Sequence, residues 1–526
     1  MCRCRTPVVL PRPAWRSRLR HAVGSGLPFL DGAAEASSNG LNLLFICSVS
    51  IQNFTILLIN IVFYHIISIQ ASIQCQIMPR ISPDEVETSL EAGATSARDI
   101  SRTLKVSQAT VSRLTAELVR RNRILRIGAA RSARYALRHD VRGIGSSWPL
   151  YLIDTEGTPH ELGTLYALAA GQFCVRTNQA KKGRPALNGL SDGIPYFLQD
   201  QKPAGFLGRQ VPALYPELQL PQRTMDWHDD HYLIYLTQRG SDPLGNLVLG
   251  TAALNRYLAR PEGLAAIPAT ERAKRYPDLA AAAMAGGWPG SSAHGEHPKF
   301  TALLRHDHAD IQVLVKFSPP IDTVVGRRWS DLLIAEHHAH VLLESAGVRA
   351  CRSQVLLGPE RTFLEVERFD RVGASGRVGV TSLFAIDSCF YGQMDHWIAA
   401  AERLAADRRI DANDLQHIRL LSAFGALILN NDRHFGNLAF FDNYDGRFVL
   451  APMYDMLPML FAPQHDQIPT RRFEPARADA QTLAVWSQAR ALAQQYWQRL
   501  ADDNRISSAF REIAAQAKPS GHNYAG

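Results

Sequence analysis

The sequence predicts a mixed α+β protein in which a small basic helical module precedes a two-lobed body with a helical C-terminal lobe. Three observations carry this prediction. Short helical patterns rich in arginine occupy residues 82–138. Apolar alternation typical of strands follows, as in DIQVLVKFSP at 310–319. The apolar helix IRLLSAFGALI at 418–428 then leads into a strongly polar loop.

Composition limits the class of protein. The chain has 526 residues, enough for several domains, with 46% hydrophobic and 20% charged residues, as in ordinary globular proteins. Of its seven cysteines, four precede Met78, and the other three, Cys174, Cys351 and Cys389, lie far apart without a CxxC spacing. This pattern argues against a disulfide framework or a zinc site, and it favours a cytoplasmic location.

Residues 1–77 differ from the rest of the chain. A basic head is followed by a stretch without charged residues, 36–79, which contains LLFICSVSIQNFTILLINIVFYHIISI. Its Ile, Asn, Phe and Tyr content contrasts with the Ala, Arg, Gly and Leu of the remainder, which indicates translated upstream DNA and a true start at Met78. The alternatives are a membrane anchor, which the polar residues inside the run oppose, and a targeting segment. We therefore expect no membrane association.

Residues 78–140 predict a winged helix-turn-helix domain. SPDEVETSLEAG, TSARDISRTLKV and SQATVSRLTAELVRRNRI read as three helices, each with a serine and an early acid or polar residue at its start. The short LKVS turn joins the second helix to the third, as helix-turn-helix geometry requires. ILRIGAARSARYALR then reads as a two-stranded wing.

The charge of this module predicts that it binds DNA. Between Arg98 and Arg138 there are eleven Lys and Arg residues against Asp99 and Glu117, a balance of +9, whereas the whole chain has +8. The arginines expected to contact phosphates are Arg120, Arg121, Arg123, Arg131 and Arg134. The side chains expected to face base edges are Gln108, Thr110, Ser112 and Arg113. The alternative is a winged helix that serves protein contacts or dimerisation.

After a predicted linker at 138–147, the chain reads as α+β without chemistry of its own until GGWPGSSAHGEHPKFTALL at 286–304. There a Gly/Ser-rich turn leads into Lys299 and an apolar strand, which suits a cradle of backbone N–H groups for phosphate. The stretch lacks the GxxxxGK[ST] of a Walker loop, and an ordinary surface loop is the alternative.

A lysine on a strand and a glutamate on a helix follow. Lys316 lies inside the apolar run DIQVLVKFSP, and Glu336 lies twenty residues later on the helical pattern SDLLIAEHHAHVLLESAGV. This is the order of the ion pair that holds ATP phosphates in protein kinases. The alternative for Lys316 is a side chain that snorkels out at a strand end. Further on, RTFLEVERFDR reads as a strand that runs into a hinge between two lobes.

The polar loop after the apolar helix has the spacing of a kinase catalytic loop. Asp432 precedes Asn437 by five residues, as in HRDxxxxN, and a predicted hairpin then ends at Asp455. Asp432 would accept a proton from a substrate hydroxyl, while Asn437 and Asp455 would hold Mg²⁺ through oxygen atoms. Arg433 and His434 are expected to brace the loop or neutralise charge. The alternative is a polar loop that merely caps the helix.

These motifs, NNDRHFGN, LAPMYD, LEVERFDR and VLVKF, resemble the HipA-like serine/threonine kinases of bacterial toxin–antitoxin systems, and most of all the YjjJ-type branch, in which a helix-turn-helix is fused to the kinase. The resemblance implies a two-lobed protein-kinase-like fold. It assigns the catalytic base to Asp432, the Mg²⁺ ligands to Asn437 and Asp455, an ATP contact to Lys316, and the adenine hinge to Glu367 through Phe369.

The resemblance also implies a regulatory loop. Family members carry an SxxGxQxK-like loop whose serine is autophosphorylated, which ejects the loop and inactivates the kinase. The corresponding SAHGEHPK assigns the autophosphorylated residue to Ser292 and the nucleotide contacts to Gly295 and Lys299. His297 stands where the family has glutamine.

The sequence thus predicts an ATP- and Mg²⁺-dependent protein serine/threonine kinase fused to a DNA-binding domain, acting as a toxin–antitoxin-like growth regulator. The expected partners are DNA, a translation-related protein substrate and a second copy of the chain. Two other hypotheses remain open: a DNA-binding regulator whose degenerate kinase body senses a nucleotide, and a metal-dependent DNA hydrolase that uses Asp432 and His434. The expected divisions are 1–77, 78–140, 148–366 (N-lobe with its preceding subdomain) and 367–526 (C-lobe).

Overall fold

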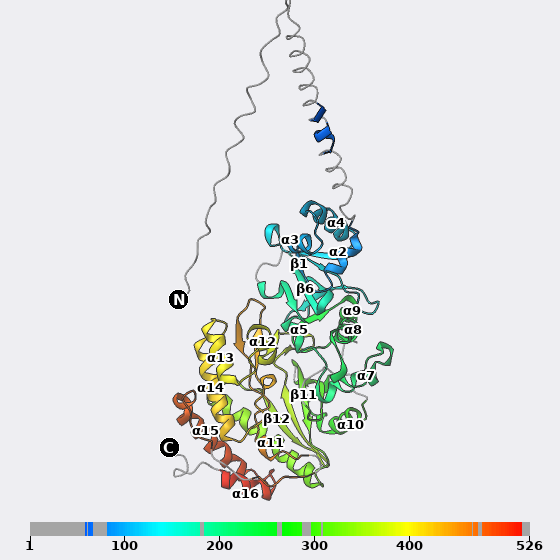
Figure 1. The fold of residues 1–526 in the computed structure, drawn as a ribbon. Helices are drawn as coiled ribbons and strands as arrows, with labels where there is room; N and C mark the ends of the chain where they lie inside the picture. The colour runs from blue at the N-terminus through cyan, green and yellow to red at the C-terminus, as the bar shows by residue number, and fades with distance from the viewer. Residues whose placement is uncertain are drawn as a thin grey trace, which may run out of the picture. The chain divides into compact units, whose positions relative to one another are not determined.

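The structure is a computed structural model in which the chain divides into two units, Met1–Arg80 and Ile81–Gly526 (Figure 1). It describes residues 58–59, 62–66, 81–178, 184–259, 266–286, 296–306, 309–464, 467–471 and 476–517. Within these ranges, no helix is both long enough and apolar enough to cross a membrane. All elements named below belong to the second unit.

An N-terminal module, residues 81–137, consists of three short helices and a three-stranded antiparallel sheet of order β1-β3-β2. Its elements are α2 (Pro83–Ser89), β1 (Thr95–Ser96), α3 (Ala97–Thr103), α4 (Gln108–Arg120), β2 (Ile124–Ile127) and β3 (Arg134–Leu137). Serines at 82, 96 and 107 cap the three helices, each accepting a backbone N–H bond three residues on. The predicted helices and wing strands are therefore all present, around a core that includes Leu114 and Ile124.

A middle sheet of order β7-β6-β5-β4-β8 adjoins this module. Its strands are β4 (Ser147–Ile153), β5 (Pro159–Ala167), β6 (Gln172–Thr177), β7 (Gly189–Asp192) and β8 (Leu247–Leu249). The helices of this region are α5 (Tyr196–Gln199), α6 (Gly205–Gly208), α7 (Val211–Leu214), α8 (Asp229–Arg239) and α9 (Thr251–Leu258), of which α8 and α9 pack on the sheet.

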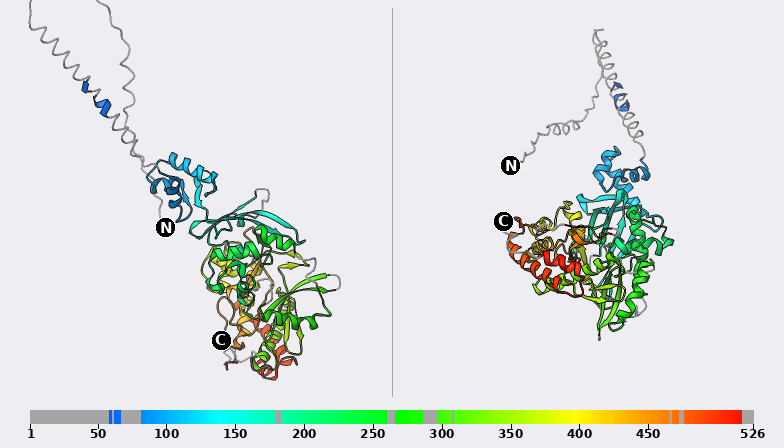
Figure 2. Two further views of the ribbon diagram at one scale, coloured as in Figure 1. Left: turned by 90° about the vertical axis from the view of Figure 1, so that its right-hand side faces the viewer. Right: turned by 90° about the horizontal axis from the view of Figure 1, so that it is seen from below.

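The segment predicted to be a linker, 138–147, is hydrogen-bonded to this middle sheet. Arg138 forms a β-bridge with Leu168, and the His139 amide donates to the Ala167 carbonyl at 3.0 Å. From the module itself, the Ala94 amide donates to Gln172 Oε1 at 2.7 Å. The module is thus fastened to the middle sheet rather than tethered by a free chain, as the neighbouring blue and cyan ribbons in Figure 2 illustrate.

The next sheet has the order β12-β13-β11-β10-β9 and forms the core of the N-lobe. Its strands are β9 (Ile267–Pro268), β10 (Lys299–His306), β11 (Ala309–Phe317), β12 (Ser353–Leu357) and β13 (Thr362–Glu367). Two helices pack on it, α10 (Arg272–Met284) and the 22-residue α11 (Val324–Ser345). The register of β10 and β11 places Lys299 directly opposite Lys316.

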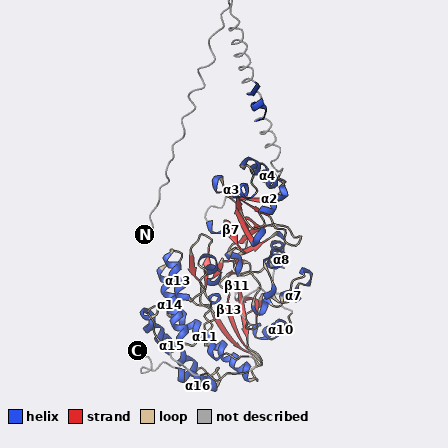
Figure 3. Ribbon diagram, in the orientation of Figure 1, coloured by secondary structure: helices blue, strands red, loops and turns tan. Residues whose placement is uncertain are grey.

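The C-lobe is mostly helical, as predicted, and its helices gather beside the strands in Figure 3. They are α12 (Leu383–Phe390), α13 (Trp397–Ala406), α14 (Ala412–Leu427), α15 (Leu483–Asp502) and α16 (Ser508–Ala517). Short strands complete the lobe: β14 (Arg371–Val372), β15 (Gly376–Arg377), β16 (Val380–Ser382), β17 (Ala439–Asp442) and β18 (Phe448–Leu450). The hairpin β17–β18 is the one predicted between Asn437 and Asp455.

A buried polar contact joins the middle region to this hairpin. Tyr196 donates its hydroxyl to Asp442 Oδ2 at 3.1 Å, as does Thr381. Burial raises the pKa of Asp442 to about 6, although these hydrogen bonds and that from the Tyr444 amide lower it. The carboxyl group is therefore more easily protonated in the folded protein than in the unfolded chain.

Candidate active site

Lys316 lies at the centre of a buried ion-pair cluster. It comes from β11, is only 7% exposed, and its ammonium group lies 2.7 and 2.9 Å from the two carboxylate oxygens of Glu336 on α11. It also contacts the carboxylate of Asp455. The alternative that Lys316 snorkels to solvent is wrong, because the whole side chain is buried between two acids.

The charges of this cluster compensate one another. Burial alone would raise the pKa of Asp455, but the ammonium groups of Lys316 and Lys299 lower it to about 2. Burial likewise lowers the pKa of Lys316, and the two carboxylates more than reverse that effect. Glu336, 1% exposed, has a raised pKa because burial outweighs its contact with Lys316. Burial lowers the pKa of Lys299 to about 8, so it is still largely a cation at neutral pH.

Asp455 occupies a fixed position after the hairpin. Its backbone adopts a left-handed φ of 53°, and its amide donates to Glu336 Oε1 at 3.2 Å. Its neighbour Tyr454 donates a hydroxyl hydrogen bond to the Gly436 carbonyl at 2.7 Å. The segment around Asp455 is thereby tied both to Glu336 and to the loop that carries Asp432.

The loop that contains Asp432 is braced by its own side chains. The Asp432 amide donates to Asn430 Oδ1 at 3.0 Å, and Asn437 Nδ2 donates to the Asp432 carbonyl at 2.8 Å. Arg433 donates to the Asn430 carbonyl at 2.8 Å, and the ring of His434 caps the next turn by accepting from the Gly436 amide at 3.0 Å. Arg433 and His434 thus each contribute a local hydrogen bond within the loop.

The carboxylate of Asp432 remains accessible within this loop. Its side chain is 48% exposed and lies 3.9 Å from His434 Nε2. Burial raises the pKa of Asp432 and the charge of Asp455 adds to this effect, whereas His434 and a hydrogen bond with the Asn437 side chain oppose it. The helix-capping alternative explains the Asn430 and His434 contacts, but it leaves this accessible carboxylate without a role.

A pocket of about 500 Å³ opens beside Asp432. Its lining comes from the loop, from the start of α13, from α14 and from the segment before and at the start of α15. These residues are His396, Trp397, Ile398, Ser422, Ala423, Ala426, Asn431, Asp432, Arg433, His434, Arg477, Asp479, Gln481, Thr482 and Trp486. The pocket leaves open space beside the Asp432 side chain. Most of its lining residues are far apart in the sequence, so no local sequence pattern marks them.

The predicted phosphate-binding loop is described only in part. Ser292 and Gly295 lie outside the described residues. Lys299, 2% exposed, begins β10 beside the ion-pair cluster. The rings of His297 and Trp329 pack together with their centroids 4.6 Å apart. Burial lowers the pKa of His297 to about 3, so its imidazole is neutral. Its Nε2 is buried without a hydrogen-bond partner.

The predicted hinge residues lie where β13 ends. The Glu367 amide donates to the Arg352 carbonyl at 2.9 Å. The Phe369 ring stacks on the Tyr454 ring, with the centroids 5.8 Å apart, and packs edge-on against the Phe441 ring, with the centroids 6.0 Å apart. Phe369 therefore links the hinge to the Asp455 segment through its side chain.

The predicted DNA-contacting residues lie on the N-terminal module. Gln108, Ser112, Arg113 and Arg131 are exposed, whereas Thr110 is half-buried, with its hydroxyl 2.9 Å from Ser107 in the helix cap.

Two of the expected phosphate contacts already have acidic partners. Arg121 pairs with Glu117 at 2.6 Å, and Arg123 forms a bidentate pair with Glu87 at 2.9 and 2.6 Å. Arg120 and Arg134 are exposed.

Asn437 and Asp455, the two residues predicted to bind Mg²⁺, both offer oxygen atoms. Within the described residues, no group of three or more His, Cys, Asp or Glu side chains could hold a metal ion. Asp455 is ionised, and Asn437 uses its amide nitrogen on the Asp432 carbonyl, which leaves the amide oxygen as its acceptor. Oxygen atoms of this kind are the donors that Mg²⁺ prefers, and Mg²⁺ keeps several waters and binds substrate phosphates.

The fold and this site define a protein-kinase-like α+β protein. Residues 144–258 match the family model of the YjjJ-like toxin middle domain, and residues 291–520 match that of the HipA-like C-terminal domain. Toxin YjjJ of Escherichia coli (strain K12) is 37% identical over 435 residues, which cover 82% of this chain and 96% of that protein. The chain belongs to the YjjJ-like branch of the HipA-type toxin family.

Two solved structures are more distant in sequence. HipA of Shewanella oneidensis MR-1, in complex with HipB and its operator DNA, is 17% identical, with a TM-score of 0.45 over 70% of this chain and 95% of that one. The Helicobacter pylori proinflammatory kinase CtkA is 11% identical, with a TM-score of 0.28 over 42% of this chain and 87% of that one.

Proposed function

We propose that the protein is an ATP- and Mg²⁺-dependent serine/threonine protein kinase. The observation that carries this proposal is the buried cluster of Lys316, Glu336 and Asp455. The negative charge of Asp455 in this cluster contributes to the raised pKa of Asp432. Protein kinases use a lysine–glutamate pair, a metal-binding aspartate and a catalytic aspartate in these roles.

Each residue would act through a property described above. Bound Mg²⁺·ATP would supply the transferable phosphoryl group, with Asn437 and Asp455 as the metal ligands. Lys316, kept in place by Glu336, would contact the nucleotide phosphates, and Lys299 would add a second buried positive charge. Asp432, with its raised pKa and accessible carboxylate, would orient the acceptor hydroxyl and take its proton.

The acceptor would enter through the pocket beside Asp432. The pocket is large enough for a side chain and has an aromatic wall from Trp397 and Trp486. A translation-related protein remains the expected substrate by family resemblance, and autophosphorylation of Ser292 is the corresponding proposal for regulation.

The N-terminal module would bind DNA through α4 and the wing. In support, its exposed Gln108, Ser112 and Arg113 lie on one helix, and Arg131 lies between the two wing strands. Two copies of the chain on a palindromic site would follow the usual symmetry of such modules.

The two rival hypotheses have less support. A degenerate nucleotide sensor would not need all of Lys316, Asp432, Asn437 and Asp455 in these positions. A metal-dependent hydrolase would need His434 as a ligand, yet His434 Nδ1 is engaged in capping the loop.

The test is transfer of the γ-phosphate of radiolabelled ATP to the purified full chain and to added cell extract, in wild type, Asp432→Asn and the matched control Asp278→Asn on the exposed face of α10. We expect label in wild type and in Asp278→Asn, and a rate about 10²–10⁴ times lower in Asp432→Asn, which is the usual effect of a positioned base. Mass spectrometry would show whether Ser292 carries the label. Equal labelling in all three proteins would refute the assignment of Asp432, and labelling in none would favour the DNA-binding regulator.

A further inference from the structure

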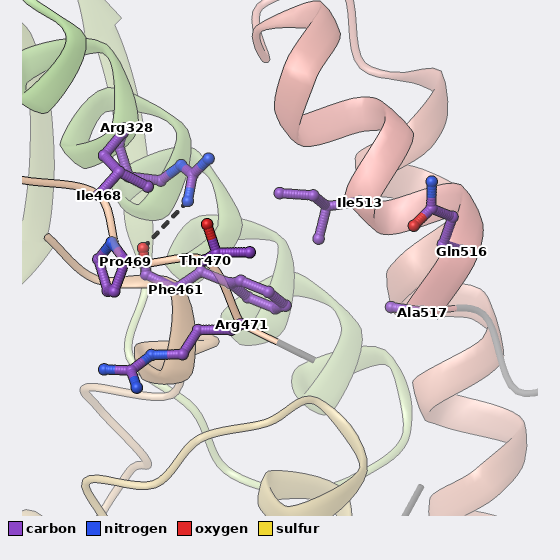
Figure 4. Close-up of a pocket in the computed structure, with 9 residues that line it drawn as sticks. All are labelled: Arg328, Phe461, Ile468, Pro469, Thr470, Arg471, Ile513, Gln516 and Ala517. Atoms are coloured by element: carbon purple, nitrogen blue, oxygen red, sulfur yellow. Dashed lines mark hydrogen bonds between the residues drawn. The ribbon is translucent and has the colours of Figure 1, made fainter. Parts of the chain in front are cut away.

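A second cavity lies away from Asp432, between α11, α16 and the segment 467–471. It has a volume of about 310 Å³ (Figure 4). Its lining residues are Arg328, Phe461, Ile468, Pro469, Thr470, Arg471, Ile513, Gln516 and Ala517. A smaller cavity of about 210 Å³ shares Arg328 and Ile468 with it and reaches the first turns of α11 and α16. None of these residues belongs to the active site described above.

Arg328 is the chemical centre of both cavities. Its side chain is buried, with 7% of the residue exposed, and its guanidinium lies over the Phe510 ring at 5.0 Å. The one hydrogen bond that it donates within the described residues goes to the Phe461 carbonyl at 3.1 Å. A guanidinium has five N–H donors in a planar fork, so most of this donor capacity is not used by the protein.

The charge of Arg328 is also poorly compensated. The acid that acts on it, Asp331, directs its two carboxylate oxygens to Ser507, at 2.8 Å to the amide and 2.6 Å to the hydroxyl. Burial therefore prevails and lowers the pKa of Arg328. A buried cation without a paired anion is costly, and an anion placed in the cavity would remove much of that cost.

The surroundings favour an anion joined to an apolar body. Figure 4 shows the Thr470 hydroxyl on the same side of the cavity as the Arg328 guanidinium, with Ile513 on α16 facing them. Arg327 and the N-terminal turns of α11 and α16, which carry partial positive charge, line the smaller cavity. Phe461, Ile468, Pro469, Ile513 and Ala517 supply apolar walls.

We propose that this cavity is a binding site for a small organic oxyanion, in which Arg328 and Thr470 bind a carboxylate or phosphate group and the apolar walls hold a short hydrocarbon or aromatic body. The volume is at the lower end of the range for small-molecule sites, which suits a ligand of one ring or a short chain. Because this site is distinct from the Asp432 site, it does not depend on the kinase proposal.

The site has a direct structural route to the active site. Arg328 and Glu336 lie on the same helix, α11, eight residues apart, which corresponds to about 12 Å along the helix axis. A ligand that binds Arg328 therefore contacts α11, the helix that positions Glu336 beside Lys316.

Calorimetric titration of the full chain with phenyl phosphate and benzoate tests the proposal, with benzyl alcohol as the neutral equivalent and inorganic phosphate as the anion without an apolar body. We expect both aromatic anions to bind and benzyl alcohol not to bind. Arg328→Met keeps most of the side-chain volume and removes the guanidinium, so it should weaken binding about 10- to 100-fold. The exposed Arg275→Met on α10 is the control and should bind as wild type does.

A second variant protects the test against misfolding of Arg328→Met. Ile513→Trp leaves Arg328 in place but fills the cavity from α16, and it should abolish binding of both aromatic anions. If phenyl phosphate binds equally to wild type and Arg328→Met, the anion occupies another site, such as the one around Lys316, and the proposal is wrong. Binding that survives Ile513→Trp, or the absence of binding to wild type, would overturn it as well.

Discussion

Replacing Lys316 with methionine should reverse the pH dependence of the stability that the buried cluster contributes. The change keeps a long side chain but removes the cation between Glu336 and Asp455, whose carboxylates both contact it in the wild type. Breaking a buried ion pair by removing one partner costs about 3–5 kcal/mol, because a buried charge is left uncompensated.

The wild-type contribution can be worked from Asp455. Its pKa lies at about 2 in the folded protein against an ordinary 3.8, and each pKa unit corresponds to about 1.4 kcal/mol. Ionised Asp455 therefore stabilises the fold by about 2 kcal/mol. Since this pKa is lowered on folding, the contribution is present above about pH 4 and is lost as the pH falls toward 2.

In Lys316→Met, the pH dependence of the stability contributed by these carboxyl groups should have the opposite sign. Burial raises the pKa of Glu336 even in the presence of Lys316, and without the cation both carboxyl groups should have raised pKa values. A pKa raised on folding gives stability that is present at acidic pH and lost as the pH rises. The deficit of the variant relative to wild type should thus be larger at about pH 8 than at about pH 5.

The assay is thermal unfolding of wild type and Lys316→Met from about pH 4 to pH 8, with Lys274→Met on the exposed face of α10 as the control. Comparison of each variant with wild type removes the effects of all other titrating groups. Parallel pH profiles for wild type and Lys316→Met would refute the view that Lys316 compensates two buried carboxylates.

Three further predictions concern the N-terminal module and the hairpin contact. Arg113→Ala should weaken binding to sites enriched from random DNA by about 1–3 kcal/mol if Arg113 reads a base. Arg123→Ala should weaken DNA binding less, because Arg123 is already paired with Glu87, and loss of this exposed pair should lower the free energy of unfolding by at most about 1 kcal/mol. Gel shifts and thermal scans of both variants would separate these effects, and a larger loss of DNA binding in Arg123→Ala would contradict them. Leu114→Ala should cost about 2–5 kcal/mol because it opens a cavity in the small module core, to be measured by local hydrogen exchange in α4. Because the pKa of Asp442 is raised to about 6, its contribution to stability should be largest at acidic pH and should be lost as the pH rises from about 4 to 6. The free energy of unfolding of wild type should therefore increase relative to that of Asp442→Asn as the pH falls through this window. A difference in unfolding free energy that does not change with pH would count against the raised pKa.

The local chemistry of the site could be predicted from the sequence because its spacing is short. Asp432 and Asn437, five positions apart, lie in one loop, and Asn437 donates a hydrogen bond to the Asp432 carbonyl. Lys316 and Glu336 are only twenty residues apart, on a strand and the following helix, and their ion pair was the expected one. The three helices and two wing strands of the N-terminal module likewise followed from serine caps and apolar periodicity.

Contacts between distant segments could not be predicted in this way. The pocket beside Asp432 combines His396 with Trp486, and the cavity around Arg328 combines α11 with α16. Such pairs depend on how the C-lobe helices pack, and a single sequence does not encode that packing as a local pattern. The composition between residues 138 and 147 predicted a linker, but Arg138 and His139 pair instead with residues at the end of β5, the central strand of the middle sheet.

This contact between the N-terminal module and the middle sheet would have a geometric consequence for two copies of the chain on one stretch of DNA. Because Arg138 bridges to Leu168 and Ala94 bonds to Gln172, rotation of α4 about the helical axis of DNA would carry the whole kinase-like body with it. B-form DNA makes one turn in about 10.5 base pairs, so inserting five base pairs between two half-sites would move one body to roughly the opposite side of the duplex. The spacing of half-sites would then determine whether the two pockets beside Asp432 face the same side of the DNA or opposite sides.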